Sequence, residues 1–294
     1  MAFIEEITED EIQDGSSWNG LDKIHYLVIF GASYCDIGYN SSQPHPTEER
    51  PLGVRWPGRT YTEEGTPNWV GHLVSQYLSG RPAGHRPLVF DYAAGGNQVD
   101  GVRRQIETEF LPALGPKPEW APWSASDTLF ITWVGINDCA EATMNSIKSS
   151  VNQLLEGQEK LYEAGARNFV LIDVPPIHRL PVFANFGGGG EERAAIYASW
   201  NSHLREAIAA FSAAHPDTMA VVFSSWDTIS RILDDPAEHG FSEEDVCLAG
   251  GAIWYDYLHP TSAVHDLIAW DLAAFLAAIP PRDEMSASDV WDEA

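Results

Sequence analysis

The chain has 294 residues, of which 44% are hydrophobic and 20% charged, a balance typical of a globular protein long enough to bury a large core. It carries 17 Lys and Arg against 43 Asp and Glu, so its formal net charge is -26. Because this charge would repel nucleic acids and anionic surfaces, we expect no nucleic-acid partner and a small, neutral substrate.

The pattern of apolar residues predicts the main elements. Short apolar runs rich in β-branched residues predict buried strands at 24–30, 87–93, 128–135, 168–174 and 219–225. Helical spacing of apolar residues occurs at 68–78, 147–164, 193–214 and 262–278. Strands that alternate with helices favour a parallel sheet covered on both faces. The sequence therefore predicts a doubly wound α/β domain.

We expect one domain over residues 1–280 and a frayed acidic tail at 281–294. Two segments interrupt the alternation and are predicted loops: 39–66, rich in Pro, Gly, Ser and Thr, and 181–190, which ends in a run of glycines. Long loops on such a fold often shape a substrate pocket, and the alternative is surface decoration.

Cysteine usage and the amino terminus restrict the class further. Cys35, Cys139 and Cys247 allow one disulfide at most and lack the paired spacing of a structural zinc site. The start, MAFIEEITEDEIQDG, is acidic where a signal peptide is basic and apolar, and no run is apolar enough for a membrane span. The localisation stays open between an intracellular protein and a secreted mature form with an added Met.

Candidate functional residues follow the predicted strands, because open α/β sheets bind ligands at the carboxyl ends of their strands. The first strand ends in GASYCD, where Ser33 can present its hydroxyl at a strand-to-helix turn or act as a helix cap. The second ends in DYAAGGN, where Gly95 and Gly96 permit a tight turn that aims a backbone N–H into a cleft, or a plain helix entry.

Two further patterns complete the set. GIND follows the third strand, and the Asn137 amide there can donate to an oxyanion or cap a helix. In DYLHP, Asp256 and His259 are three residues apart on a loop held by Pro260, so the carboxylate can hold one ring nitrogen while the other faces the cleft. This geometry suits a general base. Metal binding is a competing use, but no further His or Asp cluster completes a ligand set.

Taken in this order, the four blocks resemble those of the SGNH, or GDSL-type, serine hydrolases. The resemblance spans 31–261 and implies a three-layer α/β/α sandwich with a flavodoxin-like parallel sheet of about five strands. It implies that Ser33 is the nucleophile, with Asp256 and His259 as the other catalytic residues. The oxyanion hole would consist of Ser33 N–H, Gly96 and Asn137, with no metal or cofactor.

The phrases PNWVGHL, WVGINDC and DVPPIHR are most similar to the fungal branch grouped as carbohydrate esterase family sixteen. This similarity implies an acyl-enzyme mechanism on acetyl esters of small carbohydrates, with acetylated oligosaccharides as partners. The first alternative is a lipase or general carboxylesterase acting on short-chain or aryl esters. The second is a hydrolytically inactive ligand-binding protein with the same fold.

The sequence departs from the family at one position, since Ala32 replaces the usual Asp of the GDS block. We expect activity to survive, with Asp36 bracing the loop and Gly95 contending with Gly96 for the oxyanion role. Tyr34, Trp69 and Trp254 are candidates to flank a sugar. His178 is a candidate to line the pocket, and the remaining residues of note are expected to be structural: His72, His265, Trp133 and Trp226.

Overall fold

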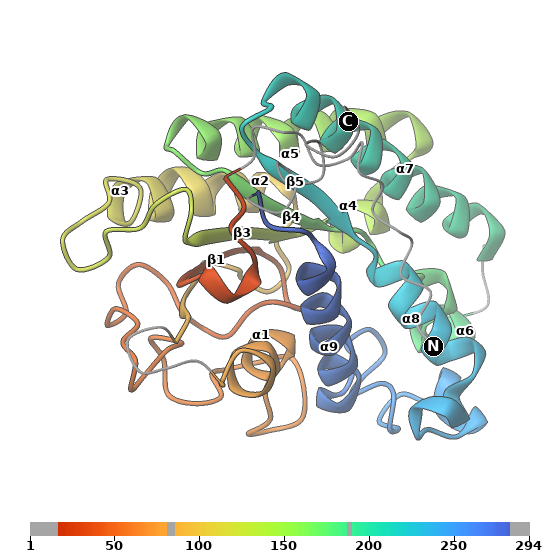
Figure 1. The fold of residues 1–294 in the computed structure, drawn as a ribbon. Helices are drawn as coiled ribbons and strands as arrows, with labels where there is room; N and C mark the ends of the chain where they lie inside the picture. The colour runs from red at the N-terminus through yellow and green to blue at the C-terminus, as the bar shows by residue number, and fades with distance from the viewer. Residues whose placement is uncertain (1–16, 81–85, 187–189, 283–294) are drawn as a thin grey trace, which may run out of the picture.

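The computed structural model describes residues 17–80, 86–186 and 190–282, and its centre is a five-stranded parallel sheet (Figure 1). The strand order is β2-β1-β3-β4-β5. β2 therefore pairs with one side of β1 and forms an edge, and β3, β4 and β5 follow in turn on the other side of β1. The strands are β1 (Tyr26–Gly31), β2 (Leu88–Asp91), β3 (Thr128–Trp133), β4 (Asn168–Ile172) and β5 (Met219–Phe223). All five predicted strands are confirmed.

Continuous apolarity explains why these segments form central strands. Every residue of β1, β3 and β4 is buried, since both faces of the sheet are covered by helices. The register pairs Val28 with Phe90 on one side and with Phe130 on the other, and Phe130 in turn pairs with Phe169. Large apolar side chains thus form continuous rows across the sheet.

Helices cover the sheet in two layers, as Figure 1 shows. One layer contains α2, α5 and α7, in which α5 contacts the other two helices, and the other layer contains α1, α8 and α9. The helices are α1 (Trp69–His72), α2 (Val99–Arg104), α3 (Leu111–Ala113), α4 (Ile136–Glu141), α5 (Met144–Glu163), α6 (Pro181–Phe186), α7 (Gly190–Ala214), α8 (Ser225–Asp234) and α9 (Ser262–Ala278). Wider π-helical turns extend α1 and join α2 to α3, at Leu73–Tyr77 and Gln105–Phe110. The prediction of a three-layer sandwich is confirmed.

The structure corrects the expected loop at 181–190. Residues Pro181–Phe186 form helix α6, which begins with a proline at the position where the missing N–H costs nothing. Residues 187–189 of the glycine run lie outside the described residues. So do the amino-terminal segment to residue 16 and the expected acidic tail from residue 283 onward.

The other long loop, 39–66, contains no helix or strand and only one isolated bridge, between Thr47 and Arg50. It is nevertheless packed on the domain, because Tyr39 and Leu52 are buried in the core. All three cysteines are free. Within the described ranges, no helix has the length and apolarity needed to cross a membrane.

Candidate active site

Ser33 lies two residues beyond β1, on a turn whose start needs a glycine. A Cβ on Gly31 would lie 2.4 Å from the carbonyl oxygen of Trp133 on β3. The buried side chain of Gln105 holds this glycine twice, accepting from its N–H at 2.9 Å and donating to its carbonyl at 2.8 Å. After it, the N–H groups of Cys35 and Asp36 donate to the Ala32 carbonyl and close the turn. Sequence reasoning missed the role of Gln105, which no local motif marks.

A row of hydrogen bonds joins the carboxyl-terminal DYLH block to this turn. His259 Nε2 lies 2.9 Å from Ser33 Oγ, and His259 Nδ1 lies 2.8 Å from Asp256 Oδ2. The other oxygen, Asp256 Oδ1, accepts the N–H groups of Leu258 and His259, each at 2.7 Å. Backbone N–H groups of this short loop therefore hold the Asp256 carboxylate, and the carboxylate in turn holds the His259 ring. Three residues predicted from two separate blocks are thus joined by consecutive hydrogen bonds.

The electrostatic setting keeps Asp256 ionised. Partial burial raises the pKa of its carboxyl, but hydrogen bonds from the N–H groups of His259 and Leu258 and from the His259 ring outweigh burial and leave the pKa lowered. Ser33 is buried, with 8% of its surface exposed. Because the ionised carboxylate contacts Nδ1, the Nδ1–H tautomer directs the Nε2 lone pair toward the Ser33 hydroxyl.

The predicted oxyanion donors differ in whether their hydrogens are already bonded. The Gly95 N–H donates to Asp36 Oδ2 at 2.8 Å and is therefore occupied. The N–H groups of Gly96 and Ser33 have no acceptor among the described residues, and Gly96 takes a φ of 76°. Asn137 Nδ2 donates one hydrogen to the Asn97 carbonyl at 2.9 Å, which leaves its second hydrogen available. These contacts favour Gly96 over Gly95 as the donor.

Asp36 and Asn68 brace the loop that follows Ser33. Besides Gly95, Asp36 accepts the N–H of Gly38 at 2.7 Å. Burial raises the pKa of this carboxyl, against the effect of the two N–H donors and of the nearby Arg59 charge. Asn68 caps α1 through Val70 N–H, and its amide donates to the carbonyls of residues 34–36, at 2.8 Å for Cys35. The expectation that Asp36 braces this loop agrees with these contacts.

Tyr61, from the long loop 39–66, contacts the site and was missed from the sequence. Its ring lies against the His259 imidazole with 5.0 Å between centroids, and its hydroxyl lies beside the Cα of Gly95. The only sequence signal was the length of the loop. The predicted aromatic flank is wrong, because Trp69 and Trp254 are fully buried and Tyr34 is almost so. Tyr34 instead donates its hydroxyl to the Leu258 carbonyl at 2.7 Å and supports the histidine loop.

The other histidines singled out in the sequence contact residues other than Ser33. His178 stacks on Trp226, which is only partly buried, with 5.3 Å between ring centroids. His72 bonds to Ser262 on α9, while buried His265 has its pKa lowered by burial to about 3. Within the described segments, no group of three or more His, Cys, Asp or Glu is placed to hold a metal ion.

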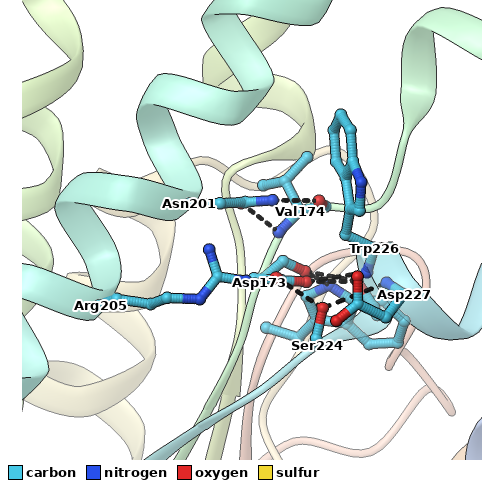
Figure 2. A network of polar contacts seen from close by, with 9 residues as sticks. Asp173, Val174, Asn201, Arg205, Ser224, Trp226 and Asp227 are labelled. Atoms are coloured by element: carbon cyan, nitrogen blue, oxygen red, sulfur yellow. Dashed lines mark hydrogen bonds and ion pairs between the residues drawn. The ribbon is translucent and has the colours of Figure 1, made fainter. Parts of the chain in front are cut away.

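A second polar network stabilises the sheet at the carboxyl ends of β4 and β5 (Figure 2). Buried Asp173 accepts the Trp226 N–H and a hydrogen of Arg205, each at 2.9 Å. Its backbone carbonyl accepts the indole N–H of Trp133 at 3.0 Å, and the Trp133 ring packs edge-on against Tyr34. Burial raises the pKa of Asp173 to about 6 despite these donors. The network joins β4 to α7 and α8, and indirectly to the histidine loop.

The fold and the hydrogen-bonded Ser33, His259 and Asp256 define a three-layer α/β/α protein with a serine-hydrolase-like site at the carboxyl ends of its strands. Residues 27–272 match the sequence profile of the GDSL-like lipase/acylhydrolase family, and the chain belongs to this family. It is accordingly a carboxylic ester hydrolase.

Individual relatives agree with this assignment. An acetylesterase of Thermothelomyces thermophilus is 30% identical over 269 residues, which cover 84% of this chain and 87% of the relative. An acetyl xylan esterase of Geobacillus stearothermophilus superposes with a TM-score of 0.54 at 13% identity, covering 88% and 98% of the two chains. A putative GDSL-like lipase of Parabacteroides merdae reaches a TM-score of 0.57 at 15% identity, with coverage of 88% and 98%. At these identities the two structures support the fold alone.

Proposed function

We propose that the protein hydrolyses acetyl esters of small carbohydrates through an acyl-enzyme on Ser33. The observation that carries this proposal is the unbroken row from Asp256 through His259 to Ser33, with contacts of 2.8 and 2.9 Å. Such a row lets the histidine remove the serine proton as the hydroxyl attacks, while the carboxylate stabilises the imidazolium that forms.

The two half-reactions use the same imidazole. In the first, a bond forms between Ser33 Oγ and the acyl carbon, the serine proton passes to His259 Nε2, and the alcohol leaves with that proton. In the second, His259 Nε2 takes a proton from water as its oxygen attacks the acyl carbon, and His259 then gives this proton to Ser33 Oγ as the bond between Oγ and the acyl carbon breaks and the acid leaves. In both, the N–H groups of Ser33 and Gly96 and the Asn137 amide would hold the oxyanion, and losing one such donor costs ~10²–10³ in turnover.

The substrate class rests on the acetylesterase relative. A lipase or general carboxylesterase would prefer longer acyl chains, and a binding protein would not turn over at all. Ala32, where the family usually has Asp, is buried and contributes its carbonyl to the turn hydrogen bonds. Because the backbone forms this turn without the Asp side chain, we expect Ser33 to be active.

The test is acid release from acetylated xylo-oligosaccharides and from p-nitrophenyl esters of increasing acyl length. We expect acetyl esters to be preferred and Ser33→Ala to lower kcat by roughly 10⁴-fold or more, with no labelling by a fluorophosphonate. Ser202→Ala, an exposed serine on α7, is the control and should retain full activity. Preference for long acyl chains would overturn the substrate class, and absence of turnover and labelling in the native chain would overturn the mechanism.

A further inference from the structure

Two neighbouring cavities lie beside the loop 39–66. The first, the inner cavity, has a volume of about 660 Å³ and is lined by residues within 36–40, 54–59 and 92–94 and by Glu109. The second, the outer cavity, has a volume of about 290 Å³ and is lined by residues within 49–56. The two share Val54, Arg55 and Trp56, so one short stretch of backbone borders both.

The inner cavity reaches the turn that carries Gly96. Two of its lining residues are Asp36 and Ala94. Asp36 accepts the N–H of Gly95, and the N–H of Ala94 donates to the Gly31 carbonyl, two residues before Ser33. The inner cavity therefore borders both the turn that follows Ser33 and the turn that leads to Gly96. The volume of the inner cavity exceeds what an acetyl group fills, and it lies within the ~300–1,000 Å³ typical of small-molecule sites.

The charges that line the inner cavity balance one another. Asp36 and Glu109 are acidic, but each accepts a hydrogen bond from a backbone N–H. The donor to Asp36 Oδ2 is Gly95, and the donor to Glu109 is Ser41, at 2.9 Å. The guanidinium groups of Arg55 and Arg59 make no hydrogen bond or ion pair with any described residue. Free donors in a cavity without excess charge fit the hydroxyl groups of a neutral ligand better than an anion or a cation.

Trp56 supplies the apolar surface at the junction. Its side chain is 49% exposed, and the outer edge of its indole ring lies near Gly71 of α1, where an added Cβ would be 3.4 Å away. The helix thus supports one edge of the ring while much of its surface stays accessible. An indole face beside guanidinium donors matches a pyranose ring, which has an apolar face and a rim of hydroxyl groups.

From these observations we propose that the two cavities are consecutive subsites for the alcohol part of the ester, a neutral oligosaccharide, with Trp56 as the stacking surface between them. The inference rests on the proposed function, since it assigns the leaving alcohol of the Ser33 reaction to these cavities. It predicts that the enzyme selects acetylated oligosaccharides over acetylated monosaccharides, because only a chain of several sugars reaches both cavities.

The first experiment measures kcat/KM for acetylated xylotetraose, acetylated xylose and p-nitrophenyl acetate. We expect Trp56→Ala to lower the ratio of tetraose to xylose efficiency by roughly tenfold, mainly through KM. Trp270→Ala, which removes an indole of similar exposure (48%) on α9, should leave the ratio unchanged. Equal loss on all three substrates, or an unchanged ratio in Trp56→Ala, would overturn the subsite assignment.

The second experiment separates this proposal from the mechanism. Binding of xylotetraose without acetyl groups is titrated by calorimetry on Ser33→Ala and on Ser33→Ala combined with Arg55→Ala or Trp56→Ala. We expect binding in the single variant and weakening by about tenfold or more in each double variant. Absence of binding, or no weakening, would overturn the subsites. If Ser33→Ala still hydrolysed esters, the proposed Ser33 mechanism would be contradicted, whereas the binding result would still test the subsites.

Discussion

The phenol ring of Tyr61 lies over the imidazole of His259, with the ring centroids 5.0 Å apart and the planes inclined by 31°. The Tyr61 hydroxyl at the same time fills the space beside Gly95, where an added Cβ would lie 1.9 Å from it. One side chain from the long loop therefore contacts both the proposed general base and the turn that carries the proposed oxyanion donor.

Removal of the Tyr61 ring should slow the reaction, whereas removal of its hydroxyl should not. We expect Tyr61→Ala to lower kcat by roughly tenfold, because the imidazole loses the surface that restrains it and excludes water. Tyr61→Phe keeps the ring and should stay within about twofold of the native value. Both are measured as kcat and KM on p-nitrophenyl acetate. Equal losses in the two variants would mean that the hydroxyl, and not the ring, is what matters.

The adjacent glycines should respond differently to alanine. In Gly95→Ala the new methyl group would collide with Tyr61, and we expect a loss of about 1–3 kcal/mol in the free energy of unfolding. Combining it with Tyr61→Ala should recover most of that loss. Gly96→Ala has open space around its Cβ but a φ of 76°, so it should cost about 1 kcal/mol whatever residue 61 is. Urea unfolding of the single and double variants measures this coupling. Additive effects of Gly95→Ala and Tyr61→Ala would contradict the contact.

The buried carboxyl of Asp173 should make stability depend on pH in a definite direction. Its pKa in the folded protein is about 6, above the ordinary value of 3.8, so the folded state holds this proton more tightly than the unfolded state. The contribution of Asp173 to stability is therefore full below pH ~4 and falls as the pH rises to ~6. Relative to the Asp173→Asn variant, the native protein should lose on the order of 3 kcal/mol of its free energy of unfolding as the pH rises over that range.

Urea unfolding of both proteins between pH 4 and pH 7 measures this difference. Asp22→Asn, which removes one negative charge from an exposed position, is the matched control for the change in net charge. If the advantage of the native protein grew with rising pH, the attraction between Asp173 and Arg205 would outweigh the cost of burying the carboxylate.

The local pattern of apolar residues was sufficient to predict the five strands and the longest helices. The five strands could be predicted because a strand buried on both faces must be apolar throughout, and helices α5, α7 and α9 because their apolar residues recur with helical spacing. The helix at α2 was missed although Val99, Val102 and Ile106 are spaced for one buried face. The predicted loop at 181–190 is wrong because only the glycines at its end disfavour a helix, whereas Pro181–Phe186 form helix α6.

For the site, the sequence determined which residues stand at the carboxyl ends of the strands, since parallel strands bring their ends to one edge. Ser33 and His259 are 226 positions apart, yet their blocks could be paired because each has its own local pattern. Only the tertiary structure decided that Asp36 occupies the Gly95 N–H, that Tyr61 covers His259, and that Trp69 and Trp254 are buried. These outcomes depend on contacts between segments remote in the chain, and no local periodicity or turn chemistry encodes them.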